Sequence, residues 1–135
     1  MDLSVEISDE ALEGYGRVNK KHSKWVIFKA DEKKEKVLLE SEGGLESTFD
    51  DFRDALPDNE PRWAAYDLKV EKADGSTAKK IVFICYVPDT YYGTDKLFFS
   101  AAKEAITKHF DGIARNIQAN DKDDVNEKEF IELFL

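Results

Sequence analysis

The feature that most constrains this chain is an uninterrupted run of apolar residues from Ile81 to Val87, "IVFICYV". A strand with one solvated face alternates apolar and polar residues, whereas a strand covered on both faces reads as a continuous apolar run. The run is also far shorter than the roughly 20 residues of a membrane-spanning helix. It therefore predicts an interior strand of a sheet that carries helices on both faces.

The remaining elements follow from hydrophobic period and turn residues. We expect helices over 8–21, 47–56, 96–110 and 125–135, and strands over 24–30, 35–41, 61–72, 78–87 and 114–119. The dipeptide Asp74-Gly75 predicts a turn between the third and fourth strands, and Pro57 follows the end of the second helix. The order predicts an α/β fold of the α+β type, with a central five-stranded mixed sheet sandwiched between helices. A length of 135 residues suits a single domain, 1–135.

Composition restricts the compartment and the partners. With a net charge of −9, the chain is a poor candidate for general nucleic-acid binding, which needs clustered Lys and Arg. Its one cysteine, Cys85, permits no internal disulfide and, within the apolar run, fits a small buried hydrophobe better than a nucleophile. The N-terminal residues lack the apolar core of a signal peptide. We therefore expect a cytoplasmic protein that is not an integral membrane protein.

No catalytic motif is found. The chain lacks a Walker A loop, an HExxH motif and a CxxC motif, and both of its histidines, His22 and His109, lie next to lysines. Carboxylates are abundant, but none accompanies a nucleophile in a recognisable acid–base arrangement. We expect neither an enzyme nor a bound cofactor.

The segment "DKDDVNEKEFIE" partly matches a calcium-binding EF-hand loop. Acidic residues stand at loop positions 1, 3, 7, 9 and 12, namely Asp121, Asp123, Glu127, Glu129 and Glu132. However, Val125 occupies position 5 and Asn126 replaces the glycine that the turn needs at position 6. We expect an acidic turn that caps the last helix and no metal site, with calcium binding as a remote alternative.

The predicted helix 96–110 has two distinct sides when it is wound at about 100° per residue. Its broad apolar side, expected to face the sheet, comprises Phe98, Phe99, Ala102, Ala105, Ile106, His109 and Phe110, with Ile113 beyond. Outside it lies a narrow set that we call the lysine stripe: Lys96, Ser100, Lys103 and Thr107. On periodicity alone this stripe is an ordinary solvated face, yet this side of the helix would permit close approach by another surface at Ser100, Ala101, Lys103 and Thr107. In the first helix, Leu12 and Tyr15 are expected to face inward, with Val18 or Asn19 continuing the stripe.

The segment 66–106, "YDLKVEKADGSTAKKIVFICYVPDTYYGTDKLFFSAAKEAI", resembles the central motifs of the actin-depolymerising factor (ADF)/cofilin family. In that family a "YD" strand leads to a "KIVF" strand, a "PDT" turn and a lysine-containing helix. The similarity extends to "VEISDEAL", "KWVIFK", "FRDALPDNEPRWAAYD" and "GIARNIQAND", and so to nearly the whole chain. It implies an ADF-homology fold and a monomeric protein that binds actin monomers and filaments and promotes filament depolymerisation.

The resemblance also implies site residues, carried over by position. The implied surface for monomeric actin comprises Leu3, Ser4, Val5, Lys96, Leu97, Ser100 and Lys103. The implied filament surface comprises Lys79, Lys80, Glu127 and Glu129. Ser4 is the candidate phosphorylation site, although the family's regulatory serine aligns with Leu3. Phosphoinositides are a weaker expected partner than actin.

Several positions depart from the family pattern. Thr94 replaces the first of two basic residues at the helix entry, Tyr91-Tyr92 replaces "A-P", and Ala78 replaces a basic residue before "KIVF". Residues 111–135 carry three basic and seven acidic side chains, a local charge of −4. Because repulsion from acidic actin weakens association, this charge predicts weak severing.

Other functions remain open from the sequence. A coactosin-like or glia-maturation-factor-like protein of the same fold would bind filaments or the branching complex. A phosphoinositide- or calcium-responsive adaptor is a further alternative, supported only by the acidic end and the scattered lysines.

Overall fold

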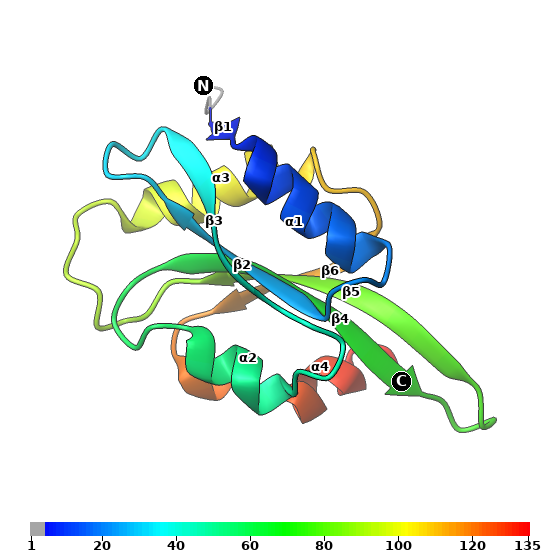
Figure 1. Ribbon diagram of the computed structural model, residues 1–135. Coiled ribbons are helices and arrows are strands. Elements are labelled where there is room, and N and C mark those ends of the chain that lie inside the picture. Colours follow the sequence, from blue (N-terminus) through cyan, green and yellow to red (C-terminus); the bar gives the residue numbers. More distant parts are fainter. Residues whose placement is uncertain (1–4) are drawn as a thin grey trace.

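A computed structural model describes residues 5–135, which form one mixed sheet covered by helices on both faces (Figure 1). Helices α1 and α3 cover one face, and α2 and α4 cover the other. The elements are β1 (Glu6–Ile7), α1 (Asp9–Asn19), β2 (Trp25–Ala30), β3 (Lys36–Gly43), α2 (Phe49–Ala55), β4 (Arg62–Glu71), β5 (Thr77–Tyr86), α3 (Lys96–Thr107), β6 (Ile113–Ala119), a 3₁₀ turn η1 (Lys122–Asp124) and α4 (Glu127–Glu132).

The sheet has six strands in the order β1-β3-β2-β4-β5-β6, so the prediction of five strands is wrong by one. The additional strand, β1, pairs in parallel with the start of β3. Glu6 N–H donates to the carbonyl of Glu35 at 3.0 Å, and the Glu6 carboxylate lies 3.6 Å from the Lys36 ammonium. A strand of two residues has no hydrophobic period, so only the partner strand reveals it.

The apolar run forms the second half of β5 and the residue that follows it, and the prediction of an interior strand is confirmed. β5 lies between β4, its antiparallel partner, and β6, its parallel partner. Residues 81–87 are all buried. Because side chains alternate along a strand, Ile81, Phe83 and Cys85 pack under α1 and α3, and Val82, Ile84 and Tyr86 pack under α2 and α4.

Helix α1 begins as predicted, because Ser8 Oγ accepts a hydrogen bond from Ala11 N–H at 3.1 Å. Its inward face, however, includes Ala11 and Gly14, whereas Leu12 is 38% exposed, so the prediction for Leu12 is wrong. A Cβ at position 14 would lie 3.1 Å from the side chains of Leu39 and Val26. α1 therefore approaches the sheet too closely for a large residue in the middle of its inner face.

Helix α3 is shorter than predicted, since it ends at Thr107. His109 lies beyond the helix and is exposed, and Ile113 belongs to β6, so neither lies on the inner side of α3 as expected. Phe110 is buried, in agreement with the prediction. The helical period assigned His109 inward only because it was extended past the true end of the helix.

Gly43 and Gly44 give a matched test of packing at the end of β3. A Cβ at Gly43 would lie 2.2 Å from Nε1 of Trp25, whose indole is fixed by donation to Ser47 Oγ at 2.9 Å. A Cβ at Gly44 would meet nothing within 4 Å. We expect Gly43→Ala to lower the free energy of unfolding by about 1–3 kcal/mol, as overpacked cores do. Gly44→Ala is expected to change it by less than about 0.5 kcal/mol. Urea denaturation of both variants checks this, and equal effects would contradict the packing around Trp25.

Candidate functional site

Helix α3 is attached to the sheet through a buried tryptophan. The indole Nε1–H of Trp63, on β4, donates to the backbone carbonyl of Phe99 at 3.0 Å. The thiol of Cys85, on β5, lies 3.5 Å from the same oxygen. The Trp63 ring also packs against Phe98 and Phe99, with centroid separations of 6.2 and 5.3 Å. These contacts fix the N-terminal half of α3 against the centre of the sheet.

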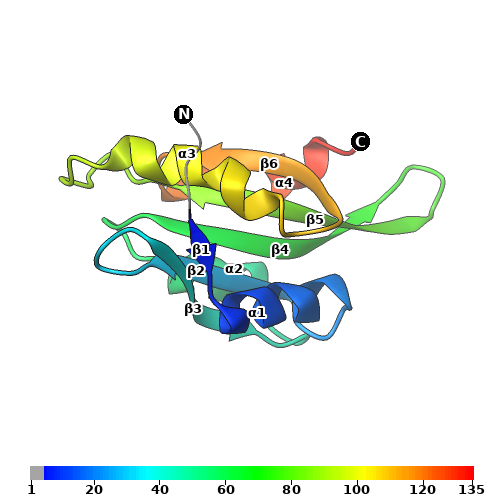
Figure 2. The ribbon, with the colours of Figure 1, turned by 90° about the horizontal axis from the view of Figure 1, so that it is seen from above.

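The segment after α3 is held against α1, which lies beside it on the same face (Figure 2). The ring of Phe110 stacks on Tyr15 with centroids 4.2 Å apart and packs against Phe28 at 5.3 Å. The Tyr15 hydroxyl donates to the carbonyl of Asp111. Burial, aided by the negative charge of Asp111, raises the pKa of Tyr15 to about 12, so this donor stays protonated at neutral pH.

The outward face of α3 differs from the predicted lysine stripe. Apart from Lys96, the exposed positions of α3 and of its C-terminal cap form a line, Leu97, Ala101, Glu104 and Lys108, which we call the outer line. In the lysine stripe only Lys96 is exposed, and the other three members, Ser100, Lys103 and Thr107, are half-buried. The stripe is therefore a flank of the helix. Ala101, which the sequence places among the residues that permit close approach, lies on the outer line, and Glu104 is a surface residue that the sequence did not single out. Centring the helical wheel on Leu97 would have identified Glu104.

One side of the lysine stripe lies close to Cys85. Burial is the main cause that raises the pKa of the Cys85 thiol, to about 11, and the Lys103 charge and the Ser100 hydroxyl partly offset it. The thiol itself is fully buried and protonated at neutral pH, which agrees with its predicted role as a small hydrophobe.

The loop that enters α3 is fixed by a polar contact of Tyr91. Its hydroxyl donates to Asp95 Oδ1 at 2.6 Å, and this bond, more than burial, raises the pKa of Tyr91 to about 12. The other oxygen of Asp95 lies 3.9 Å from the ammonium of Lys34. Asp95 precedes the helix but makes no side-chain capping bond. Its carboxylate instead joins the entry loop to the turn between β2 and β3.

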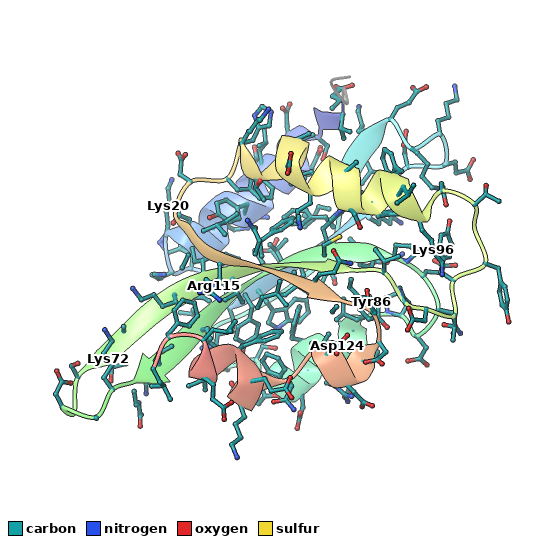
Figure 3. All side chains as sticks on the ribbon, turned by 180° about the vertical axis from the view of Figure 1, so that it is seen from behind. Lys20, Lys72, Tyr86, Lys96, Arg115 and Asp124 are labelled. Carbon is teal, nitrogen blue, oxygen red and sulfur yellow. The ribbon has the colours of Figure 1, made fainter. Side chains whose placement is uncertain are left out.

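Lys96, the first residue of α3, lies where this loop enters the helix (Figure 3). Its ammonium donates to the carbonyl of Asp89 at 3.3 Å. The neighbouring Leu97 is 85% exposed. The N-terminal part of the predicted monomer surface is only partly described: Val5 is half-buried against the α1/α3 side of the core, and Leu3 and Ser4 lie outside the described residues.

The predicted filament residues come from β5 and α4. By strand alternation Lys79 lies on the α1/α3 face and Lys80 on the α2/α4 face, so only Lys80 shares a face with Glu127 and Glu129 of α4. Lys79, Glu127 and Glu129 are exposed, whereas Lys80 is half-buried. Because the two lysines lie on opposite faces of the sheet, they cannot both contact one flat partner surface.

The β4–β5 hairpin projects beyond the helices, with Lys72 near its tip (Figures 1 and 3). Beside it, an open groove of about 500 Å³ lies between β4, the start of α2 and α4. Tyr66, Lys69 and Glu127 are among the residues that line it. Of the predicted filament residues, Glu127 lines this groove, whereas Lys79, Lys80 and Glu129 do not.

The acidic segment before α4 forms local caps. Asp121 Oδ1 accepts from Asp124 N–H at 3.0 Å, Asp124 Oδ2 accepts from Asn120 N–H at 2.8 Å, and Asn126 Oδ1 accepts from Glu129 N–H at 3.0 Å. This is the capping turn that the sequence predicts. Within residues 5–135, no group of three or more His, Cys, Asp or Glu side chains is arranged to hold a metal ion. Nor does any helix in that range have the length and apolarity to cross a membrane.

Comparison with known proteins identifies the class. Residues 4–134 match the family described as cofilin/tropomyosin-type actin-binding protein. The chain belongs to this family, and the resemblance seen in the sequence is confirmed. Because the family is one of actin-binding proteins, the prediction that the chain is not an enzyme is also confirmed.

Particular relatives agree with this assignment. The chain is 39% identical over 102 residues to an actin-depolymerizing factor of Vitis vinifera, covering 76% of this chain and 71% of that protein. It is 29% identical over 124 residues to actophorin of Acanthamoeba castellanii, covering 91% of this chain and 89% of that protein. Streptomyces griseoflavus cofilin superposes with a TM-score of 0.84 at 26% identity, covering 95% of each chain. Coactosin from Entamoeba histolytica superposes with a TM-score of 0.81 over 96% of this chain and 93% of that one, but at 16% identity this shows the fold alone.

Burial of Cys85 predicts how the thiol responds to pH. Because its pKa is raised from 9.0 to about 11, its contribution to stability is fully present below pH 9 and is lost as the pH rises toward 11, where the unfolded chain ionises first. We expect the free energy of unfolding to fall more between pH 9 and 11 in the parent than in Cys85→Ala. Thiol labelling at pH 8 should be slow in the native chain and fast in urea. Rapid native labelling would contradict the placement of α3 over the thiol.

Proposed function

We propose that this chain binds actin monomers and filaments and promotes filament depolymerisation, acting as a single ADF-homology domain in the cytoplasm. Membership of an actin-binding family over residues 4–134 supports the partner, and relatives named actin-depolymerizing factors support the activity. The structural observation that carries the proposal is α3: its inner side is tied to the sheet through Trp63, and its outer line has no partner within the described residues.

The proposed surface for the monomer combines the start of α3 with the N-terminal segment. It comprises Lys96, Leu97, Ser100 and Lys103 together with Leu3, Ser4 and Val5. Leu97 offers apolar area at the centre, and the lysines on its flank suit an acidic partner. Ser4 is the proposed phosphorylation site, since a phosphate there would add negative charge to a surface that must approach acidic actin.

The proposed filament surface uses Lys80 and the start of α4, with Glu127 and Glu129, and extends along the projecting hairpin to Lys79. Its electrostatics are less favourable than those of the monomer surface, because residues 111–135 carry a local charge of −4. We propose that the filament contact is the weaker one and that severing is weak. Phosphoinositides are a secondary partner, since a net charge of −9 disfavours anionic headgroups except at local lysines.

Coactosin-like activity, the main alternative, predicts filament binding with little monomer binding. The named relatives favour depolymerisation, whereas the coactosin similarity concerns the fold. Titration of labelled actin monomers alongside filament pelleting separates the two functions.

The monomer surface is tested by the double variant Lys96→Ala, Lys103→Ala. We expect the affinity for actin monomers to fall by at least about tenfold, because two charges near the centre of the contact are lost. Lys20→Ala with Lys72→Ala is the matched control: both are exposed, the change in net charge is equal, and neither lies on α3. Circular dichroism verifies folding. Equal affinities in a folded test variant and the control would refute the site.

Weak severing is tested by single-filament microscopy at saturating protein. We expect filaments to shorten from their ends with few internal breaks, because the acidic C-terminal region opposes contact with a second acidic subunit. Raising the ionic strength should strengthen filament binding relative to monomer binding, since salt screens the repulsion. Frequent internal breaks at low salt would show that the local charge does not limit severing.

A further inference from the structure

We propose that Tyr92 is an aromatic anchor of the contact with the actin monomer, and that it sets a large part of the affinity. This inference rests on the proposed function and extends it to a residue that the family pattern does not supply, since Tyr91-Tyr92 stands where the family has "A-P". The anchor is expected to enter an apolar pocket of the monomer that is rimmed by acidic groups.

The first observation is the exposure of Tyr92. Its side chain is 98% exposed, the highest value among the large hydrophobic residues of the described chain. Leu97, five positions further on, is 85% exposed. A tyrosine buries about 150–250 Å² when it becomes covered, and tyrosine is enriched among residues that dominate binding energy. An exposed ring beside an exposed leucine provides the apolar centre that an interface needs.

The second observation is that the backbone around Tyr92 is held in place. Asp89 N–H donates to the carbonyl of Asn120 at 2.8 Å, and Thr90 Oγ1 lies 2.6 Å from Asn59 Oδ1. Tyr91 N–H donates to the carbonyl of Pro88 at 3.0 Å. The Pro88–Tyr91 segment is thus joined both to the end of β6 and to the loop before β4.

The side chain of Tyr91 also fixes this loop, through contacts with the start of α3. Its hydroxyl binds Asp95, and its ring packs edge-on against Phe99 with centroids 6.0 Å apart. Of the two adjacent tyrosines, one is therefore used to fix the loop and the other is presented to solvent. A fixed loop reduces the ordering cost that binding would otherwise incur, which favours a recognition role for the presented ring.

The third observation is continuity with the proposed monomer surface. Tyr92 precedes α3 by four residues, and Lys96 and Leu97 open that helix at the same end. The combination of an aromatic ring, an aliphatic side chain and an ammonium group fits an apolar pocket with a carboxylate at its rim.

Two other binding partners of the Tyr92 surface fit less well. An anionic lipid surface would meet Asp89 and Asp95, the acidic residues of the same loop. A symmetric contact between two copies would bring the same patch of each together, and so place the two Lys96 side chains close to one another. Each copy also carries a net charge of −9. The local chemistry therefore favours the actin monomer as the partner, because its acidic surface suits Lys96.

The test compares three variants in a titration of labelled actin monomers. We expect Tyr92→Ala to weaken binding by at least about tenfold, the size typical of a central aromatic residue. Tyr92→Phe keeps the ring and is expected to stay within about threefold of the parent. Leu45→Ala is the control, because Leu45 is 57% exposed and lies between β3 and α2, away from α3. It should bind like the parent.

The outcomes separate this inference from the proposed function. If the parent chain does not bind monomers, the proposed function fails. If the parent binds and Lys96→Ala with Lys103→Ala weakens it, but Tyr92→Ala binds as well as Leu45→Ala, then the function stands and the anchor is refuted. Sedimentation velocity of the chain alone adds a further check: a dimer that Tyr92→Ala abolishes, with unchanged affinity for actin, would assign the ring to self-association and overturn the proposal.

Discussion

The burial of β5 on both faces is the constraint on which the rest of the molecule depends. Residues 81–87 have no polar side, so helices must cover both faces of the strand to remove them from water. Ile81, Phe83 and Cys85 require α1 and α3 on one face, and Val82 and Ile84 require α2 and α4 on the other. The two proposed actin contacts follow from this arrangement, because α3 and α4 are fixed on opposite faces of the same strand.

Buried polar contacts then decide what each exposed surface presents. The hydrogen bond from Trp63 to the Phe99 carbonyl is worth about 1 kcal/mol by itself, but it also fixes which side of α3 faces outward. The α1 helix supports this arrangement through the Tyr15–Phe110 stack. A buried carboxylate, Asp67, pairs with Lys21 at 3.0 Å and holds the end of α1 against β4. The α1/α3 layer is thereby fixed at both ends, which suits a surface that recognises a partner without reorganising.

Charge is distributed unevenly over this scaffold. A net charge of −9 repels other acidic surfaces, so association with acidic actin requires a local cluster of basic side chains. Lys96 and Lys103 provide such basic side chains at α3, whereas α4 and the segment before it carry mostly carboxylates. Several of those carboxylates are used as caps, as Asp121 and Asp124 are, which explains their number without a metal ion. The same contrast supports a stronger monomer contact and a weaker filament contact.

The resemblance of the chain's motifs to the ADF/cofilin family predicted the membership of an actin-binding family, which the match over residues 4–134 confirms. The local pattern of residues was enough to predict the interior strand, the four helices and the Ser8 cap. These three features depend on neighbours in the chain, through alternation, helical period and turn chemistry. It did not predict β1, because a strand of two residues exists only through its pairing with β3. It misplaced Leu12 and His109, since the distance of α1 from the sheet and the end of α3 are set by packing. Likewise, Asp95 was free to cap α3 and instead binds Tyr91, whose ring is positioned by Phe99. Contacts between segments far apart in the chain determine the pairing of β1, the inner face of α1, the end of α3 and the partner of Asp95. The same contacts leave Tyr92 and the outer line of α3 facing solvent.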